Sequence, residues 1–146
     1  MTKGKVTAII SNLISIEVDG PVSQNEICYV SCGEARLMAE VIKIAGTSAS
    51  AQVFESTRGV KLGNSVEFTG SMLEIELGPG LLGKNFDGLQ NDLDKLQGVF
   101  LERGKYNNLA ENKEARYDFT PIAKVGDEVQ AGDWIGAIKE GWIDHK

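Results

Sequence analysis

The two differently patterned halves of the chain meet at a glycine-rich run, Leu77-Gly78-Pro79-Gly80-Leu81-Leu82-Gly83-Lys84-Asn85-Phe86-Asp87-Gly88-Leu89-Gln90-Asn91-Asp92-Leu93. Within it, Gly78 to Lys84 has the G-x-x-x-x-G-K spacing of a phosphate-binding loop, in which a Ser or Thr follows to bind Mg²⁺ and a helix begins. Here Asn85 follows, Asp87-Gly88 makes a turn, and Pro79 removes one backbone donor. We therefore predict a structural connector and no nucleotide site. Its turns are expected at Gly78, Pro79, Gly80, Gly83, Asp87 and Gly88.

Residues 5–70 consist of short apolar stretches with turn residues about every ten positions, which is typical of a small sandwich or barrel. In Leu13–Val18 apolar and polar residues alternate, so one face of the strand meets a core and the other meets water. The expected strands are Val6–Ile10, Leu13–Val18, Ile27–Val30, Leu37–Ile44, Ala51–Phe54 and Ser65–Phe68. Because six short strands can close on themselves and leave no exposed edge, the sequence predicts a small closed six-stranded β-barrel over residues 1–70.

Residues 71–96 are expected to lead out of the barrel as a connector. Apolar residues at its start alternate with two glutamates, which predicts one more half-buried strand. These apolar residues are Leu73, Ile75 and Leu77. Three leucines then recur at i, i+4 and i+7, the spacing of one face of a short helix, and Asp87 is a suitable residue to begin it. They are Leu89, Leu93 and Leu96. A helix of roughly ten residues is marginal alone in water, so we expect it to dock on other parts of the protein.

Residues 97–146 are expected to form a second small β-rich module, so the whole chain is predicted to be mainly β. From Gln97 to Arg116 the apolar pattern degrades, which predicts exposed and mobile structure. Tyr117–Pro121 is expected to be extended, because the residue before a proline is held out of the helical region. Beyond it, Gly126-Asp127 and Gly132-Asp133 predict two tight turns.

These two turns resemble the hammerhead half of biotinyl and lipoyl carrier domains. Such domains present a modifiable lysine at a hairpin tip a few residues further on. The aligned position here holds Trp142, and Lys139 and Lys146 are displaced from it. A carrier, or another stand-alone β-rich binding module, is therefore the alternative function.

Length and charge limit the classes of protein to which the chain can belong. The 146 residues suit one modest domain or two small ones. A net charge of −6 argues against nucleic acid or an anionic membrane as partner, so proteins are the expected partners. The sequence has no apolar run near 18 residues, and Met1 to Lys5 leads into a strand pattern, so neither a transmembrane helix nor a signal peptide is expected.

No set of residues has the pattern of a catalytic, cofactor or metal site. Four carboxylates near the connector are expected on a solvated face, namely Glu74, Glu76, Asp92 and Asp94. A nucleophile triad needs a histidine, and His145 is next to the C-terminal end, where fraying would spoil its geometry. Trp134 is expected to fill a small core, and a role for Trp134 and Trp142 as interface anchors is the alternative.

Cys28 and Cys32 are expected to be reduced thiols. They lie four positions apart in a strand-like region, and at about 3.3 Å per residue their Cα atoms are too far apart for a disulfide, which spans up to roughly 7 Å. A metal site would need more ligands, and His145 lies at the other end of the chain. Reduced and partly buried thiols are typical of a cytoplasmic protein.

The glycine-rich run also carries a family resemblance. Gly78 to Gly83, followed after three residues by Asp87-Gly88-Leu89-Gln90, resembles the segment that leads into the nucleotide-binding domain of the catalytic A subunit of V/A-type (vacuolar and archaeal-type) rotary ATPases. Further segments resemble the N-terminal barrel of that subunit, in its order: Val18–Glu26, Ala39–Ile42, Gln52–Gly59 and Val66–Gly70. One departure is Asp92, where the family usually has proline, and it puts the shape of this turn in doubt.

The resemblance implies an N-terminal fragment that contains the barrel, the connector and the start of the inserted β-rich domain. In that family A subunits alternate with B subunits in a hexameric head, the barrels form a crown, and Mg-ATP binds at interfaces built from later sequence. The intact subunit would couple ATP hydrolysis or synthesis to proton or sodium transport, in the cytoplasm and peripheral to the membrane. The family's phosphate loop, water-orienting glutamate and partner-supplied arginine match no position here. This chain alone is therefore expected to bind no cofactor, to be inactive, and to serve hexamer assembly.

Overall fold

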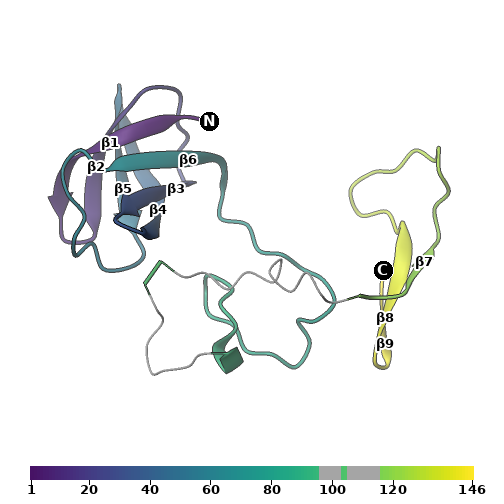
Figure 1. Ribbon diagram of the computed structural model, residues 1–146. Helices are drawn as coiled ribbons and strands as arrows, with labels where there is room; N and C mark the ends of the chain where they lie inside the picture. Colours follow the sequence, from purple (N-terminus) through teal and green to yellow (C-terminus); the bar gives the residue numbers. More distant parts are fainter. Residues whose placement is uncertain (96–102, 105–115) are drawn as a thin grey trace. The chain divides into compact units, whose positions relative to one another are not determined.

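The computed structural model describes residues 1–95, 103–104 and 116–146, which belong to two compact units (Figure 1). The first unit contains Met1–Glu74 together with Arg103 and Gly104. The second contains the described residues of Ile75–Leu96 and Asn107–Lys146. Most of the segment for which the sequence predicts exposed, mobile structure lies outside the described residues.

Six antiparallel strands close into a barrel in the first unit (Figure 1). Their order around the barrel is β1-β2-β5-β4-β3-β6, and β6 pairs again with β1. The strands are β1 (Lys3–Ile10), β2 (Leu13–Val18), β3 (Glu26–Cys32), β4 (Ala35–Ala45), β5 (Ser48–Val53) and β6 (Ser65–Met72). The predicted closed six-stranded barrel is confirmed. β2 has the predicted bounds, and the other strands differ from the predicted ranges at their ends.

The barrel interior is filled by apolar side chains that alternate along the strands. In β2, Ile14 and Ile16 are fully buried, whereas Glu17 is exposed. The largest fully buried side chains are Phe68, Ile14, Ile16, Leu37, Val6, Val30, Val41, Val53, Val66 and Cys28. Every strand contributes to this single cluster, so burial of its inward residues stabilises the closed sheet as a whole.

Bulges bend three of the strands so that the small sheet can close. The extra residue lies between Val6 and Ala8 in β1 and between Val41 and Lys43 in β4. Where β3 pairs with β6, Glu26 faces Met72 and Cys28 faces Phe68, so the extra residues lie in β6. An extra residue on one strand of a pair bends that strand and increases its twist, which a small barrel requires at its corners.

A buried carboxylate joins two corners of the barrel. Glu26, at the start of β3, accepts hydrogen bonds from the backbone amides of Ser23 and Gly70, each at 2.8 Å. Hydrogen bonds from backbone amides offset the cost of burying the carboxylate. Glu26 therefore links the turn before β3 to the chain within β6.

The half-buried strand predicted over Leu73–Leu77 is wrong. Its apolar side chains are exposed, with Leu77 81% exposed, and no strand among the described residues pairs with the segment. Instead, the side chain of Gln90 bonds the backbone of Glu76 through both its amide nitrogen and its oxygen. The backbone of Glu76 is therefore hydrogen-bonded to the side chain of Gln90 and not to a neighbouring strand.

The short helix predicted from Asp87 is also wrong. The one helical element in the described part of the chain is η1 (Leu93–Lys95), a single 3-10 turn. No helix among these residues has the length and apolar character needed to cross a membrane.

The second unit contains a three-stranded antiparallel sheet in the order β7-β8-β9 (Figure 1). The strands are β7 (Phe119–Pro121), β8 (Gly136–Glu140) and β9 (Ile143–His145).

Between β7 and β8 lie the two predicted Gly-Asp turns, which the structure confirms. In each turn the aspartate carboxylate accepts the backbone amide three residues earlier at 2.8 Å, from Lys124 to Asp127 and from Gln130 to Asp133. The preceding glycines, Gly126 and Gly132, have φ of 102° and 98°, a conformation that favours glycine.

Candidate functional site in the glycine-rich connector

The carboxylate of Asp87 organises the connector loop. Its Oδ1 accepts hydrogen bonds from the backbone amides of Leu89 (2.9 Å) and Asn91 (2.8 Å), and its Oδ2 accepts one from Asn91 Nδ2 (2.9 Å). Aspartate favours such turns because its short side chain reaches amides a few residues further along the chain. The side chain that could have begun a helix closes a loop instead.

Backbone pairing on both sides of Asp87 completes a small hairpin. Phe86 and Asp92 form an isolated antiparallel bridge, the Asp87 amide donates to the Asn91 carbonyl (3.1 Å), and the Leu93 amide donates to the Asn85 carbonyl (2.9 Å). Gln90 has a φ of 62°, in the left-handed region that a right-handed helix cannot contain. The helical spacing of the leucines is therefore coincidental.

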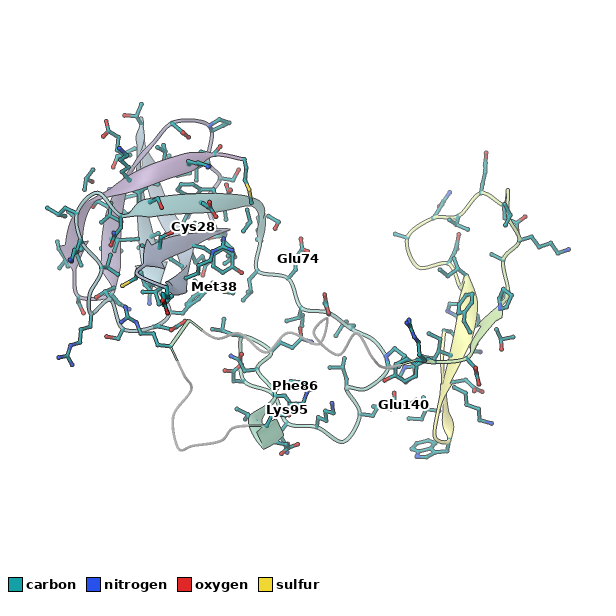
Figure 2. The ribbon with its side chains drawn as sticks, in the orientation of Figure 1. Cys28, Met38, Glu74, Phe86, Lys95 and Glu140 are labelled. Carbon is teal, nitrogen blue, oxygen red and sulfur yellow. The ribbon has the colours of Figure 1, made fainter. Side chains whose placement is uncertain are left out.

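Asp92 is a buried acid that contacts two lysines. It is 4% exposed, and its Oδ2 lies 3.6 Å from Lys84 Nζ and 3.8 Å from Lys95 Nζ (Figure 2 labels Lys95). Opposite charges nearby offset the cost of burying a carboxylate. The prediction of a solvated face is correct for Glu74, Glu76 and Asp94, which are exposed, and wrong for Asp92.

The structure places the six predicted connector residues in turns or directly beside them. Pro79-Gly80, Leu82-Gly83 and Gly88-Leu89 form turns, Gly78 lies at a bend, and Asp87 bonds the last of these turns. Gly80 and Gly83 have φ of 97° and 75°, which favours glycine at both positions. Lys84, in the place of the phosphate-loop lysine, is paired with Asp92. These contacts favour a structural loop, and the connector role of the six residues stays a prediction.

Glu140 connects this loop to the small sheet. Its Oε1 accepts the Gly80 amide at 2.9 Å, and its Oε2 lies 2.6 Å from His145 Nε2 (Figure 2 labels Glu140). A methyl group on Gly80 would lie 2.9 Å from the hydroxyl of Tyr117, two residues before β7, so the loop approaches this part of the chain closely. His145 is consequently a paired residue of β9, contrary to the expectation that it frays. Sequence reasoning missed Glu140, because nothing local to residue 140 indicates a partner sixty positions away.

Both tryptophans lie at the surface of the second unit. Trp134 is 59% exposed, with Lys146 Nζ 4.2 Å from its ring centroid, so the prediction that it fills a small core is wrong. Trp142 is 90% exposed and forms the turn between β8 and β9 with Gly141. The position aligned with the carrier lysine is therefore at a hairpin tip, and a tryptophan occupies it.

The two cysteines are free thiols in different surroundings. Cys28 is fully buried in the barrel core, whereas Cys32 is half-buried. Burial and, to a lesser extent, the Glu26 carboxylate raise the pKa of the Cys28 thiol from 9.0 to about 12. Within the described residues no three histidine, cysteine or acidic side chains are grouped as metal ligands would be.

Two parts of the chain, the barrel and the C-terminal region with the small sheet, match models of known protein families. Residues 6–70, which form almost all of the barrel, match the model of the ATP synthase alpha/beta family beta-barrel domain. Residues 108–146 match the model of the ATPsynthase alpha/beta subunit barrel-sandwich domain. The chain belongs to the ATP synthase alpha/beta family.

Within the ATP synthase alpha/beta family, the chain is similar to the N-terminal region of V-type ATP synthase alpha chains. It is 50% identical to the V-type ATP synthase alpha chain of Treponema denticola and 49% identical to those of Borreliella afzelii and Borreliella burgdorferi, over 99% of its own length in each case. It spans about a quarter of the length of these relatives. The resemblance to the catalytic A subunit is thereby confirmed.

Proposed function

We propose that the chain is the assembly and connector region of the catalytic A subunit of a V/A-type ATPase or ATP synthase. In the intact subunit this region would hold neighbouring A and B subunits in a hexameric head that couples ATP hydrolysis or synthesis to proton or sodium transport. The head would lie in the cytoplasm, peripheral to the membrane. The observation that carries the proposal is the match of residues 6–70 to a family model, on a barrel without a free strand edge.

The closed barrel suits a role in holding subunits together. Its strands are bonded on both sides, and one apolar cluster connects all six of them. Glu26 further joins two corners through buried hydrogen bonds. Such a body deforms little, so it would keep its neighbours in place while other domains of the subunit open and close.

Exposed apolar side chains mark surfaces that neighbouring subunits could cover. On the barrel, Ile10 and Leu62 are exposed, and in the second unit Trp134, Ile135 and Trp142 are exposed. Protein interfaces are enriched in tryptophan and depleted in most charged residues. These residues are the proposed contacts with other A and B subunits.

An assembly experiment tests the proposed role. An A/B head is reassembled from full-length subunits in the presence of an excess of this 146-residue chain. The chain is expected to compete with the barrels of the full-length subunits for their contacts, and so to lower the amount of hexamer measured by sedimentation velocity. The matched control is the Ile14→Asp variant, which places an unpaired charge at a fully buried position of the core and should prevent barrel formation. Equal amounts of hexamer with both chains would contradict the proposal.

Three regions are proposed along the chain. Residues 1–70 form the barrel, residues 71–96 the connector towards the nucleotide-binding domain, and residues 97–146 the start of the inserted β-rich domain. Mg-ATP would bind to other parts of the intact subunit, since Lys84 and the Gly80 amide already have partners in the chain. Titration of the purified chain with millimolar Mg-ATP is expected to give no saturable heat in calorimetry, and saturable binding would show that the connector is a nucleotide site.

A further inference from the structure

Arg103 and Gly104 return to the barrel after the chain has left it. In Figure 1 this short coloured piece lies beside the barrel, within the segment for which the sequence predicts exposed, mobile structure. The Gly104 amide donates a hydrogen bond of 2.7 Å to Glu55 Oε2, in the loop after β5. A hydrogen bond to a charged carboxylate is stronger than one between neutral groups.

The fit of Gly104 against the barrel is specific for glycine. Its φ of 72° lies in the left-handed region. A methyl group at this position would lie 2.9 Å from Ala35 Cβ and 3.4 Å from both Ala35 Cα and the Arg36 amide nitrogen. The first residues of β4 therefore leave no room for a side chain on Gly104.

Arg103 adds a second contact, on the neighbouring strand. Its Nη2 lies 3.5 Å from the sulfur of Cys32, the last residue of β3, and donates a hydrogen bond to it. The Cys32 thiol in turn donates to the Arg58 carbonyl at 3.9 Å. The half-buried sulfur of Cys32 thus lies between the returning segment and the loop after β5.

We infer that Arg103-Gly104 is a latch that fastens the chain to the barrel a second time. The barrel side of the latch is formed by Cys32, Ala35 and Glu55, and its occupant is the chain's own Arg103-Gly104 turn. The chain leaves the barrel after β6 and is bound to it again at Arg103 and Gly104. The latch fixes Arg103-Gly104 to the barrel within the first unit, and it does so whether or not the proposed function is correct.

The two cysteines allow the latch to be tested in the intact chain. Cys32 reports opening of the latch, because Arg103 contacts its sulfur, whereas Cys28 reports unfolding of the barrel, because it is fully buried in the core. The rate of iodoacetamide labelling at each cysteine is measured separately by digestion and mass spectrometry under native conditions. The two test variants are Gly104→Ala and Glu55→Gln. The matched control is Gly46→Ala, at a glycine with φ of 61° and no atom within 4 Å of an added methyl group.

Opening of the latch is expected to raise the labelling rate of Cys32 but not that of Cys28. Gly104→Ala is expected to raise the labelling rate of Cys32 about tenfold, the factor that corresponds to loss of one hydrogen bond to a charged group. Glu55→Gln is expected to raise it by a smaller factor, and Gly46→Ala to leave it unchanged. Cys28 should stay unlabelled in all of them. Wild-type rates at Cys32 in both test variants, or a proportional rise at both cysteines, would overturn the inference.

Discussion

The ammonium nitrogen of Lys84 lies 3.6 Å from the carboxylate of Asp92, which is almost completely buried in the connector hairpin. The ammonium nitrogen of Lys95 lies 3.8 Å from the same oxygen. Two lysines therefore face one buried carboxylate in this turn. An ion pair therefore contributes to holding the turn in this chain.

Removing the Asp92 carboxylate is expected to loosen the hairpin. Because both lysines are partly exposed, the cost of Asp92→Ala should be about 1 kcal/mol, or about a fivefold larger population of the open loop. Amide hydrogen exchange at Leu89 and Asn91, which are bonded to Asp87, measures this opening. Asp94→Ala removes the same charge from an exposed side chain and is the control. Identical exchange in the two variants would show that the ion pair does not hold the loop.

The barrel core should depend strongly on Phe68. This ring is 1% exposed in the apolar cluster, so Phe68→Ala is expected to lower the free energy of unfolding by about 3–5 kcal/mol. Phe54 is partly exposed, and Phe54→Ala should cost about 1 kcal/mol or less. Urea denaturation of the wild type and of both variants gives the three free energies of unfolding. Similar losses of stability in Phe68→Ala and Phe54→Ala would contradict the assignment of Phe68 to the core.

The buried thiol of Cys28 predicts a loss of stability at high pH. Its pKa is raised to about 12 in the folded barrel, so between pH 9 and 12 the unfolded chain loses the thiol proton while the folded chain keeps it. Ionisation then favours the unfolded state, and stability falls as the pH rises.

Comparison with Cys28→Ala isolates this effect. From pH 8 to pH 10 the free energy of unfolding of the wild type should fall by about 1.4 kcal/mol more than that of the variant. Urea denaturation at each pH provides the values, and other titrating groups cancel because both proteins contain them. If the free energies of unfolding of the two proteins changed equally with pH, the Cys28 thiol would ionise as readily in the folded barrel as in the unfolded chain.

Enzymatic attachment of biotin or lipoate to a lysine tests the alternative function as a carrier domain. The β8–β9 tip carries Gly141 and Trp142, and the nearest lysine of the sequence, Lys139, lies within β8. Incubation with biotin ligase or lipoyl ligase and the matching substrates is therefore expected to leave the mass of the chain unchanged. An added biotinyl or lipoyl mass on Lys139 or Lys146 would establish the carrier function.

The barrel could be predicted from the sequence because its signals are local. Alternation such as that of Ile14 and Ile16 fixes which side of a strand is buried, and turn residues mark where each strand ends. The Gly-Asp turns before β8 are local in the same way, since each aspartate bonds an amide three positions away.

The connector could not be predicted in the same way, because local signals there compete or partners are distant. Asp87 suits a helix start and a loop equally well, and the left-handed Gln90 and the Asp92 bridge select the loop. The alternation from Leu73 to Leu77 has the period of a strand, but a strand forms only where a partner is available. The pairing of Glu140 with Gly80 and the return of Gly104 to Glu55 join positions far apart in the sequence.

The small sheet of the second unit is open, whereas the barrel is closed, and this difference affects how the isolated chain behaves. Its outer strands, β7 and β9, each have one side without a neighbouring strand in the described part of the chain. Unpaired strand edges can recruit further copies of a protein, whereas a closed sheet offers none. Aggregation during expression or storage would therefore start at the free edge of β9 or at that of β7, which contains the exposed Phe119, and not at the closed barrel.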